Sequence, residues 1–436
     1  MRSLSRLLLV LSLFLGFQTA KATHLLGGEI TWACSSNGNY IFTLTLYRDC
    51  NGIPLGTNAQ TINNPAGSNI TCNFVSQTDI SPDCWNPSNP LYPVQITCAA
   101  AVANTGPDIP GAVEKYVYRS AAIPLNGVPP AAGWEFWWSS CCRPSGNQNT
   151  SSGPYYLRAK MFPYTAPGAT SPSNVSTCFD NSPIFAEDGS PVICTGYKFV
   201  YNHLAADLDL DSLSFGFADP LQSAGNPVVW NPGYTSQLPF PDPSEDPTNG
   251  PVTLDPVSGE MEMEVNQFGS SSSSGSYASC VKIEAWKSCQ LVAIVYRDVA
   301  VSMVGGCPGN LKPASEIDTA LFENVNRLST NVYQVSVYPT DTIDFELSAQ
   351  DFDFLPSGLP QSITFAAGGL QVSSPLGSGT GCLGNGTCAK ITPVAPQSSY
   401  TQGLNNTVRF FWAPDCGHLG AVSGCGSVTS TYYFTL

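Results

Sequence analysis

Apolar and polar residues alternate strictly over residues 40–47, the clearest pattern in the chain. Phe42, Leu44 and Leu46 fall on one face of an extended segment, and Thr or Tyr residues fall on the other. A period of two is typical of a β-strand that buries one face. The preceding Ser-Asn-Gly-Asn at residues 36–39 favours a tight turn, because Asn-Gly tolerates positive φ. We therefore predict an antiparallel hairpin, with a first strand over residues 30–34.

Similar strand-like runs recur along the chain, at residues 113–120, 135–138, 155–162, 197–202, 213–217, 281–286 and 291–304. Charged residues make up only 11%, whereas Gly (39) and Pro (36) are abundant. This mixture suits short strands joined by turns and disfavours long helices. The 436 residues allow about three domains.

These patterns predict an all-β protein built from tandem, disulfide-stapled β-sandwich modules of Ig-like or cadherin-like type. We expect a signal peptide and three modules, at residues 1–22, 23–175, 176–307 and 308–436. The final residues, 431–436, have a strand pattern without a closing turn. We therefore expect the third module to be truncated and the natural protein to be longer.

An acidic loop lies between two of the predicted strands. Asp207, Asp209 and Asp211 fall at every second position, so their carboxylates point the same way in an extended loop. Ca²⁺ takes six to eight oxygen ligands, and these carboxylates are candidates for them. The alternative is a solvated acidic turn without an ion.

A weaker copy of this unit follows in the last third of the chain. An alternating run at residues 345–349 leads into Asp351 and Asp353, and an apolar face resumes at residues 363–365. The pair is a weak second candidate for Ca²⁺. Two copies of strand, acidic turn and strand suggest an array of modules rather than one enzyme body.

The N-terminus has the features of a secretory signal. Arg2 and Arg6 precede an apolar run at residues 7–17, which is too short for the ~20 residues that span a bilayer. Ala20 and Ala22 supply small residues for cleavage after Ala22. No later stretch reads as a transmembrane segment, so we expect a secreted protein or one at the outer cell surface.

The sixteen cysteines then predict structural disulfides, because export removes the chain from the reducing cytosol. Zinc is the competing interpretation, but after the signal the chain has only His24, His203 and His418 as partners. Cys50, Cys72, Cys84 and Cys98 are expected to staple the first module.

Local spacing predicts some pairings. Cys382 and Cys388 flank an Asn-Gly turn, which sets the two side chains nearly opposite, and Cys416 and Cys425 enclose a Gly-rich loop. We expect each of these to be a local pair. Cys141 and Cys142 are adjacent, and neighbours in a strand point to opposite faces, so we expect separate partners; a vicinal disulfide or redox pair is the alternative.

The hairpin near residue 288 excludes one pairing. With a turn at Lys287 and Ser288, Cys280 faces about Val295. Cys289 then lies some six strand residues away, roughly 20 Å. A disulfide needs Cα atoms within about 7 Å, so Cys280 and Cys289 should not be bonded to each other.

An aromatic cluster is the remaining candidate for ligand contact. Alternation places Trp134, Phe136 and Trp138 on one face and Trp137 on the other. We expect one of these faces to be core, with a sugar-stacking platform as the alternative.

Little points to catalysis or nucleic-acid binding. The sequence has no Gly-x-Ser-x-Gly elbow, no His-Glu-x-x-His pair and no phosphate-binding loop. A net charge of −15, with only 17 Lys and Arg residues, repels phosphate backbones. We expect neither an enzyme nor a partner of nucleic acid.

Several segments together resemble one family, the large secreted surface proteins of Bacteroidetes, which are gliding-motility-associated and adhesin-like. The segments are HLLGGEITW (24–32), TLTLYRDC (43–50), WSSCCR (138–143), CFDNSPIF (178–185), YNH (201–203), the loop at 207–213 and, more faintly, FWAPDC (411–416). The resemblance covers most of residues 24–307. Family members carry many Ig-like, PKD-like or cadherin-like modules.

The resemblance implies export and then release or surface attachment through a C-terminal sorting domain, as in type IX secretion. The family's acidic loop usually reads Asp-x-Asp-Gly-Asp, whereas Leu210 stands at the Gly position here. The predicted function is a non-catalytic structural or adhesive protein that contacts a polysaccharide or protein at the cell surface or outside the cell. The alternatives are polysaccharide-binding accessory modules of a larger hydrolase, or a secreted hydrolase.

Overall fold

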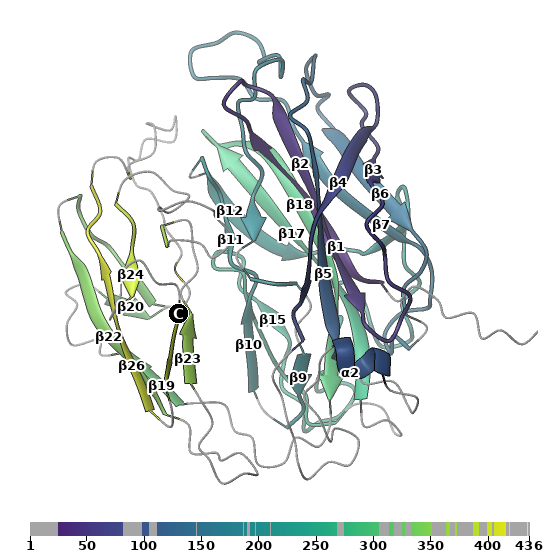
Figure 1. The fold of residues 1–436 in the computed structure, drawn as a ribbon, viewed down its shortest axis with the longest axis vertical. Helices are drawn as coiled ribbons and strands as arrows, with labels where there is room; N and C mark the ends of the chain where they lie inside the picture. The colour runs from purple at the N-terminus through teal and green to yellow at the C-terminus, as the bar shows by residue number, and fades with distance from the viewer. Residues whose placement is uncertain are drawn as a thin grey trace, which may run out of the picture.

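The computed structural model describes the chain in stretches: residues 25–81, 98–103, 111–144, 146–185, 187–189, 192–196, 198–209, 211–267, 274–304, 314–317, 325–327, 333–339, 341–350, 363–366, 371–372, 387–391, 399–402, 405–415, 418 and 434. These residues form an almost entirely β structure with antiparallel sheets, as the sequence predicts (Figure 1). The one helix among them is the short α2 (Cys98–Ala103). No helix in the described stretches is long and apolar enough to cross a membrane.

The longest hairpin is made by β17 (Ser274–Lys287) and β18 (Gln290–Val304). Its two turn residues, Ser288 and Cys289, have φ of 49° and 62°. Positive φ at both central positions defines the type I′ turn, whose twist matches that of the flanking strands. The turn lies one residue later than predicted, and the register shifts by one more residue between Ala285 and Trp286, so Cys280 faces Asp298 rather than Val295.

The other edge of β18 is shared by three strands from distant parts of the chain. In order along β18 they are β7 (Tyr155–Met161), β1 (Leu25–Cys34) and β9 (Val192–Cys194), and only β9 runs parallel to it. Figure 1 shows the purple β1 beside the green β18. β18 therefore joins four strands into one sheet.

The sheet continues outward on both sides. Beyond β1 come β2 (Tyr40–Asp49), β5 (Val113–Ser120), β4 (Ile70–Asp79) and β3 (Gln60–Ile62); β12 (Ser212–Phe217) pairs with β17, and β6 (Trp134–Ser140) pairs with β7. Smaller sheets are β10 (Lys198–Asn202) with β16 (Glu260–Glu264) and β15 (Thr253–Leu254), β8 (Ile184–Phe185) with β11 (Ala205–Ala206), and β13 (Leu221–Ser223) with β14 (Asn226–Pro227).

The C-terminal strands form sheets of their own (Figure 1). They are β19 (Ala314–Ile317), β22 (Ile343–Gln350), β26 (Asn405–Trp412) and β24 (Lys390–Ile391), then β20 (Val325–Arg327) with β21 (Tyr333–Val335), and β23 (Ile363–Ala366) with β25 (Ser399–Gln402). Within the described stretches, no strand pairing crosses residue 308.

The boundary expected at residue 175 does not separate two sheets. Strands β1 to β7 lie before it and β9, β12, β17 and β18 after it, yet all belong to one sheet. This corrects the expectation that residues 23–175 and 176–307 close as independent modules. Strand alternation reports which face of a strand is buried, and it does not report which strand lies alongside.

The main core confirms the predicted faces. Phe42, Leu44 and Leu46 are completely buried, and Trp32, Phe42 and Phe136 pack together with ring centroids 4.8–6.2 Å apart. Phe136 and Trp138 face this core, and Trp134 packs against it. Trp137 lies on the opposite face, half-buried and stacked on Tyr156.

Two disulfides join distant segments, Cys34–Cys178 and Cys50–Cys98. Cys280 has a free thiol and Cys289 is disulfide-bonded, so the prediction that they do not pair is confirmed. Cys72 is also a free, buried thiol, which corrects its expected role as a staple.

Cys141 and Cys142 are bonded to each other, which corrects the expectation of separate partners. Strand β6 ends at Ser140, so the pair lies beyond the strand and strand alternation does not apply to it. Cys388 is disulfide-bonded, but its expected partner Cys382 lies outside the described residues, as do Cys416 and Cys425.

The contact of β1 with β18 depends on a glycine. Gly27 has φ of +136° and pairs with Val299, and a Cβ at Gly27 would lie 1.9 Å from the carbonyl oxygen of Asp298. We expect Gly27→Ala to destabilise the fold by about 3 kcal/mol or more, through backbone strain and steric overlap. Urea unfolding of both proteins measures the difference.

Gly56→Ala is the matched control, because Gly56 has φ of +76° but nothing lies within 4 Å of its added Cβ. It should cost about 1 kcal/mol from backbone strain alone. Equal losses in the two variants would show that the close approach of β1 to β18 is unimportant.

Candidate functional site

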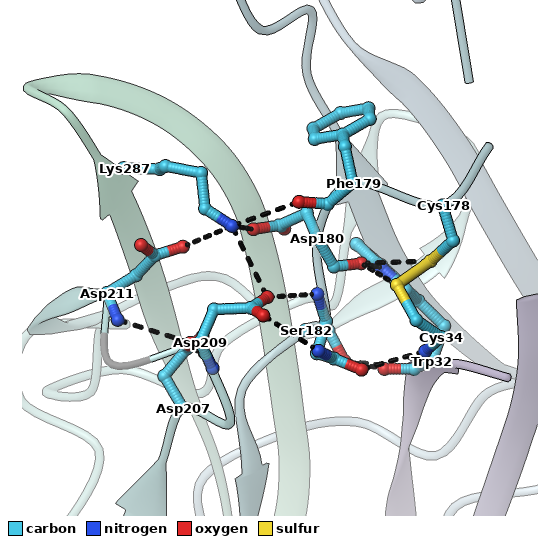
Figure 2. Close-up of polar contacts among 11 residues, drawn as sticks. Trp32, Cys34, Cys178, Phe179, Asp180, Ser182, Asp207, Asp209, Asp211 and Lys287 are labelled. Atoms are coloured by element: carbon cyan, nitrogen blue, oxygen red, sulfur yellow. Dashed lines mark hydrogen bonds and ion pairs between the residues drawn. A yellow bond between two sulfur atoms is a disulfide. The ribbon is translucent and has the colours of Figure 1, made fainter. Parts of the chain in front are cut away.

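The acidic loop is one side of a buried charged cluster, which we call the Lys287 cluster. It consists of Asp180, Asp207, Asp209, Asp211 and Lys287 (Figure 2). Its groups come from three places: the segment after Cys178, the loop between β11 and β12, and the last residue of β17.

The segment that carries Asp180 is fixed to β1. The disulfide Cys34–Cys178 ties its start to the end of that strand. The backbone N–H of Trp32 donates to Ser182 Oγ at 2.8 Å, and the Trp32 indole N–H donates to the Asp180 carbonyl at 3.2 Å. Asp180 is therefore held on rigid backbone, with only 1% of its surface exposed.

The acidic loop is shaped by its own first carboxylate. Asp207 Oδ1 accepts the backbone N–H of Asp209 at 2.8 Å and of Asp211 at 3.2 Å. Aspartate often organises turns in this way. The Asp209 carboxylate accepts the backbone N–H and the side-chain amide of Asn181, at 2.6 and 3.0 Å, which joins the loop to the segment of Asp180.

The ammonium group of Lys287 reaches into this acidic site. Its Nζ lies 2.7 Å from Asp180 Oδ1 and 3.3 Å from both Asp209 Oδ2 and Asp211 Oδ2. It also donates to the Phe179 carbonyl at 3.1 Å. Figure 2 shows the lysine side chain entering between the carboxylates from one side, with the disulfide on the other.

Burial dominates the electrostatics of the cluster. It raises the pKa of Asp180 well above the ordinary value, although the attraction of Lys287 opposes the effect. Burial, with the carboxylates of Asp211 and Asp209, raises the pKa of Asp207 to about 8. Burial lowers the pKa of Lys287, but its three carboxylate neighbours outweigh that and leave the pKa above its usual range. The cluster thus combines one fixed cation with a buried carboxyl group, that of Asp207, which keeps its proton up to about pH 8.

A calcium ion at this loop fits the geometry only in part. The carboxylate oxygens of Asp180, Asp209 and Asp211 lie within 4.8 Å of one another, which is close enough to share an ion. However, Lys287 makes ion pairs with all three, and Asp207 directs one oxygen at its own loop backbone. The lysine ammonium supplies the positive charge that a metal would supply, so no role is assigned to Ca²⁺ here.

Sequence reasoning found three of the five residues of this site. The structure brings Asp207, Asp209 and Asp211 together, but Asp180 and Lys287 were missed. The available signal was weak: Lys287 directly precedes the hairpin turn, and Asp180 follows a cysteine by two residues. Asp351 and Asp353 lie outside the described residues.

A second group of buried charges lies along β18. Arg297 pairs with Glu29 at 3.4 Å and donates to the Tyr47 hydroxyl at 2.9 Å. The next residue, Asp298, accepts from Arg143, with Nη1 at 2.8 Å from Oδ1. Successive residues of a strand point to opposite faces, so this dipeptide places an ion pair on each side of the sheet.

His203 lies near the first of these pairs. It is 1% exposed, lies edge-on to Tyr201 with ring centroids 4.8 Å apart, and neither ring nitrogen has a hydrogen-bond partner within the described part of the chain. Burial, together with the charge of Arg297, lowers its pKa well below the ordinary value. The histidine is therefore packed in the core and neutral. Within the described residues it forms no hydrogen bond with the carboxylates of the acidic loop.

The comparisons with known proteins leave the site to be interpreted from its own chemistry. No family model matches the sequence, and no curated protein matches it.

The raised pKa of Asp207 predicts how stability depends on pH. The folded state holds a proton on this group up to about pH 8, whereas an unfolded aspartate releases it near pH 4. The contribution of Asp207 to the free energy of unfolding is therefore fully present below about pH 4 and is lost as the pH rises towards 8. Asp207→Asn keeps the side-chain oxygen that caps the loop but cannot ionise.

We expect the stability of Asp207→Asn relative to the wild type to increase between pH 5 and pH 8.5, by roughly 2–4 kcal/mol. Urea midpoints at both pH values measure this difference. Asp341→Asn, at an exposed aspartate, is the control and should show no such trend. A difference between Asp207→Asn and wild type that does not change with pH would contradict the assignment.

Proposed function

We propose that the chain is a stiff, non-catalytic part of a secreted or surface-attached protein, with a structural and adhesive role towards a polysaccharide or protein outside the cell. The expected Ig-like or cadherin-like sandwich modules belong to this proposal, and so does the link to Bacteroidetes surface proteins. The observation that carries it is the way β18 holds four strands together with an ion pair on each face.

Buried ion pairs between distant segments support a mechanical role. Arg143 and Asp298 are 155 residues apart in the sequence, and their side chains are almost completely buried. The guanidinium of Arg143 also lies over the Tyr155 ring, 3.9 Å from its centroid. Separating such a pair leaves a charge stranded in the interior, which costs about 3–5 kcal/mol. We therefore expect the segments that carry these groups to unfold cooperatively.

The disulfides add covalent limits to extension. Cys34–Cys178 closes a loop of 144 residues across the sheet that contains β1 and β18. A force applied to the ends of the chain cannot extend the residues inside that loop without reducing the bond. Disulfides form and persist in the oxidising environment that an exported protein meets.

Single-molecule stretching of the chain from residue 23 onwards tests the proposal. We expect the strands around β18 to resist as one unit and to open in a single step. Arg143→Met should lower the opening force, because it leaves Asp298 buried without its partner. The double variant Arg143→Met with Asp298→Leu removes both charges and should recover most of that force. Gradual extension of the wild type at low force would contradict a mechanical role.

Calcium binding at the acidic loop stays a prediction of the sequence, and Lys287 decides its test. We expect the melting temperature of the wild type to be the same in chelator and in millimolar Ca²⁺, because the side chain of Lys287 already occupies the position between the carboxyl groups. Lys287→Met leaves those carboxylates facing one another, so Ca²⁺ should raise its melting temperature by a few degrees. Stabilisation of the wild type by Ca²⁺ would instead mean that the ion displaces Lys287.

A further inference from the structure

Lys287 and Asp180 have the arrangement of two groups that can join covalently. An amine and a carboxyl group lie in contact, 2.7 Å apart from Nζ to Oδ1, and two further carboxyl groups lie 3.3 Å from the same nitrogen. We propose that Lys287 and Asp180 condense to an intramolecular amide bond, which cross-links the end of β17 to the segment after Cys178. The idea deepens the proposed structural role and rests on it for its biological purpose.

The reaction balances without any further reactant. The ammonium of Lys287 and the carboxylate of Asp180 become an amide and one water molecule. A bond forms between Nζ and the Asp180 carboxyl carbon, and one carbon–oxygen bond of that carboxyl group breaks. Of the three protons on the ammonium, one stays on the amide nitrogen and two leave with the oxygen. No group is oxidised or reduced.

The position of the nitrogen favours attack on Asp180 rather than on its neighbours. Asp180 is the nearest carboxyl group, and its side chain is only 1% exposed. Asp209 is farther away, more exposed, and accepts two hydrogen bonds from Asn181. Reacting atoms that are already in contact convert a slow bimolecular condensation into an intramolecular step.

Asp211 is placed to move the protons. Its Oδ2 is 3.3 Å from Lys287 Nζ, and its carboxyl group lies within 4.8 Å of that of Asp180. It can accept a proton from the nitrogen and return it to the departing oxygen. Its raised pKa, caused mainly by burial, suits a group that both takes up and releases a proton.

The surroundings favour the condensed product. The side chains of Asp180, Asp211 and Lys287 are 1%, 8% and 16% exposed, so little solvent is available to hydrolyse the bond. Condensation also replaces a buried ion pair by a neutral amide, which removes the cost of keeping two charges out of water. The link would join residues 107 apart, next to the disulfide Cys34–Cys178, and would persist under reducing conditions.

Mass spectrometry of the full, folded chain after reduction and alkylation tests the proposal. We expect a mass lower than calculated by one water molecule, loss of tryptic cleavage after Lys287, and a branched peptide that joins Lys287 to Asp180. Lys287→Arg keeps the positive charge but cannot form this bond, so it should have its full calculated mass. Asp180→Asn should form the same amide with loss of ammonia in place of water.

Two further variants separate proton transfer from simple packing. Asp211→Asn should leave the circular dichroism spectrum unchanged and reduce the cross-linked fraction at least tenfold, whereas Asp209→Asn should remain cross-linked. A full-mass wild type that unfolds cooperatively would overturn the inference. A deficit of one water with normal cleavage after Lys287 would also overturn it, because it indicates a cyclised aspartate. Neither result bears on the stretching experiment, so the structural role stands or falls separately.

Discussion

Backbone hydrogen bonding along β18 is the constraint on which the rest of this structure depends. One edge of the strand is used by β17, and the other is divided among β7, β1 and β9. Each backbone group on that edge needs a partner once it is buried, so three distant segments have to arrive in register. The approach is close enough that Gly27 meets β18 where no side chain fits.

The buried charged residues have one role in common in this structure. The charged residues are few, and the buried arginines Arg48, Arg143 and Arg297 each face a carboxylate from another segment. Such pairs add little net stability compared with an apolar core, but a single broken partner is costly. They therefore specify which segments meet. The same Tyr-Arg-Asp sequence occurs at residues 47–49 and 296–298, and in both copies the arginine is buried beside a glutamate.

The Lys287 cluster follows the same rule at the end of the sheet. A hairpin, a disulfide-bonded segment and an acidic loop meet there, and one ammonium group compensates several carboxylates. Because Lys287 pairs with these carboxylates, the acidic residues of the loop can be explained without a bound metal. An internal partner also keeps reactive groups in contact for the lifetime of the fold, which is the condition that covalent cross-linking needs.

Local sequence patterns predicted the strands and turns of this protein, because alternation and turn chemistry depend only on residues that are close in the sequence. The strand over residues 113–120 and the buried face of Phe42, Leu44 and Leu46 follow from it directly. Asp207, Asp209 and Asp211 were recognisable for the same reason. The pairing of β18 with β7, β1 and β9 and the meeting of Asp180 with Lys287 were not. Contacts across more than a hundred residues depend on how strands pack side by side, and no spacing in the sequence encodes that.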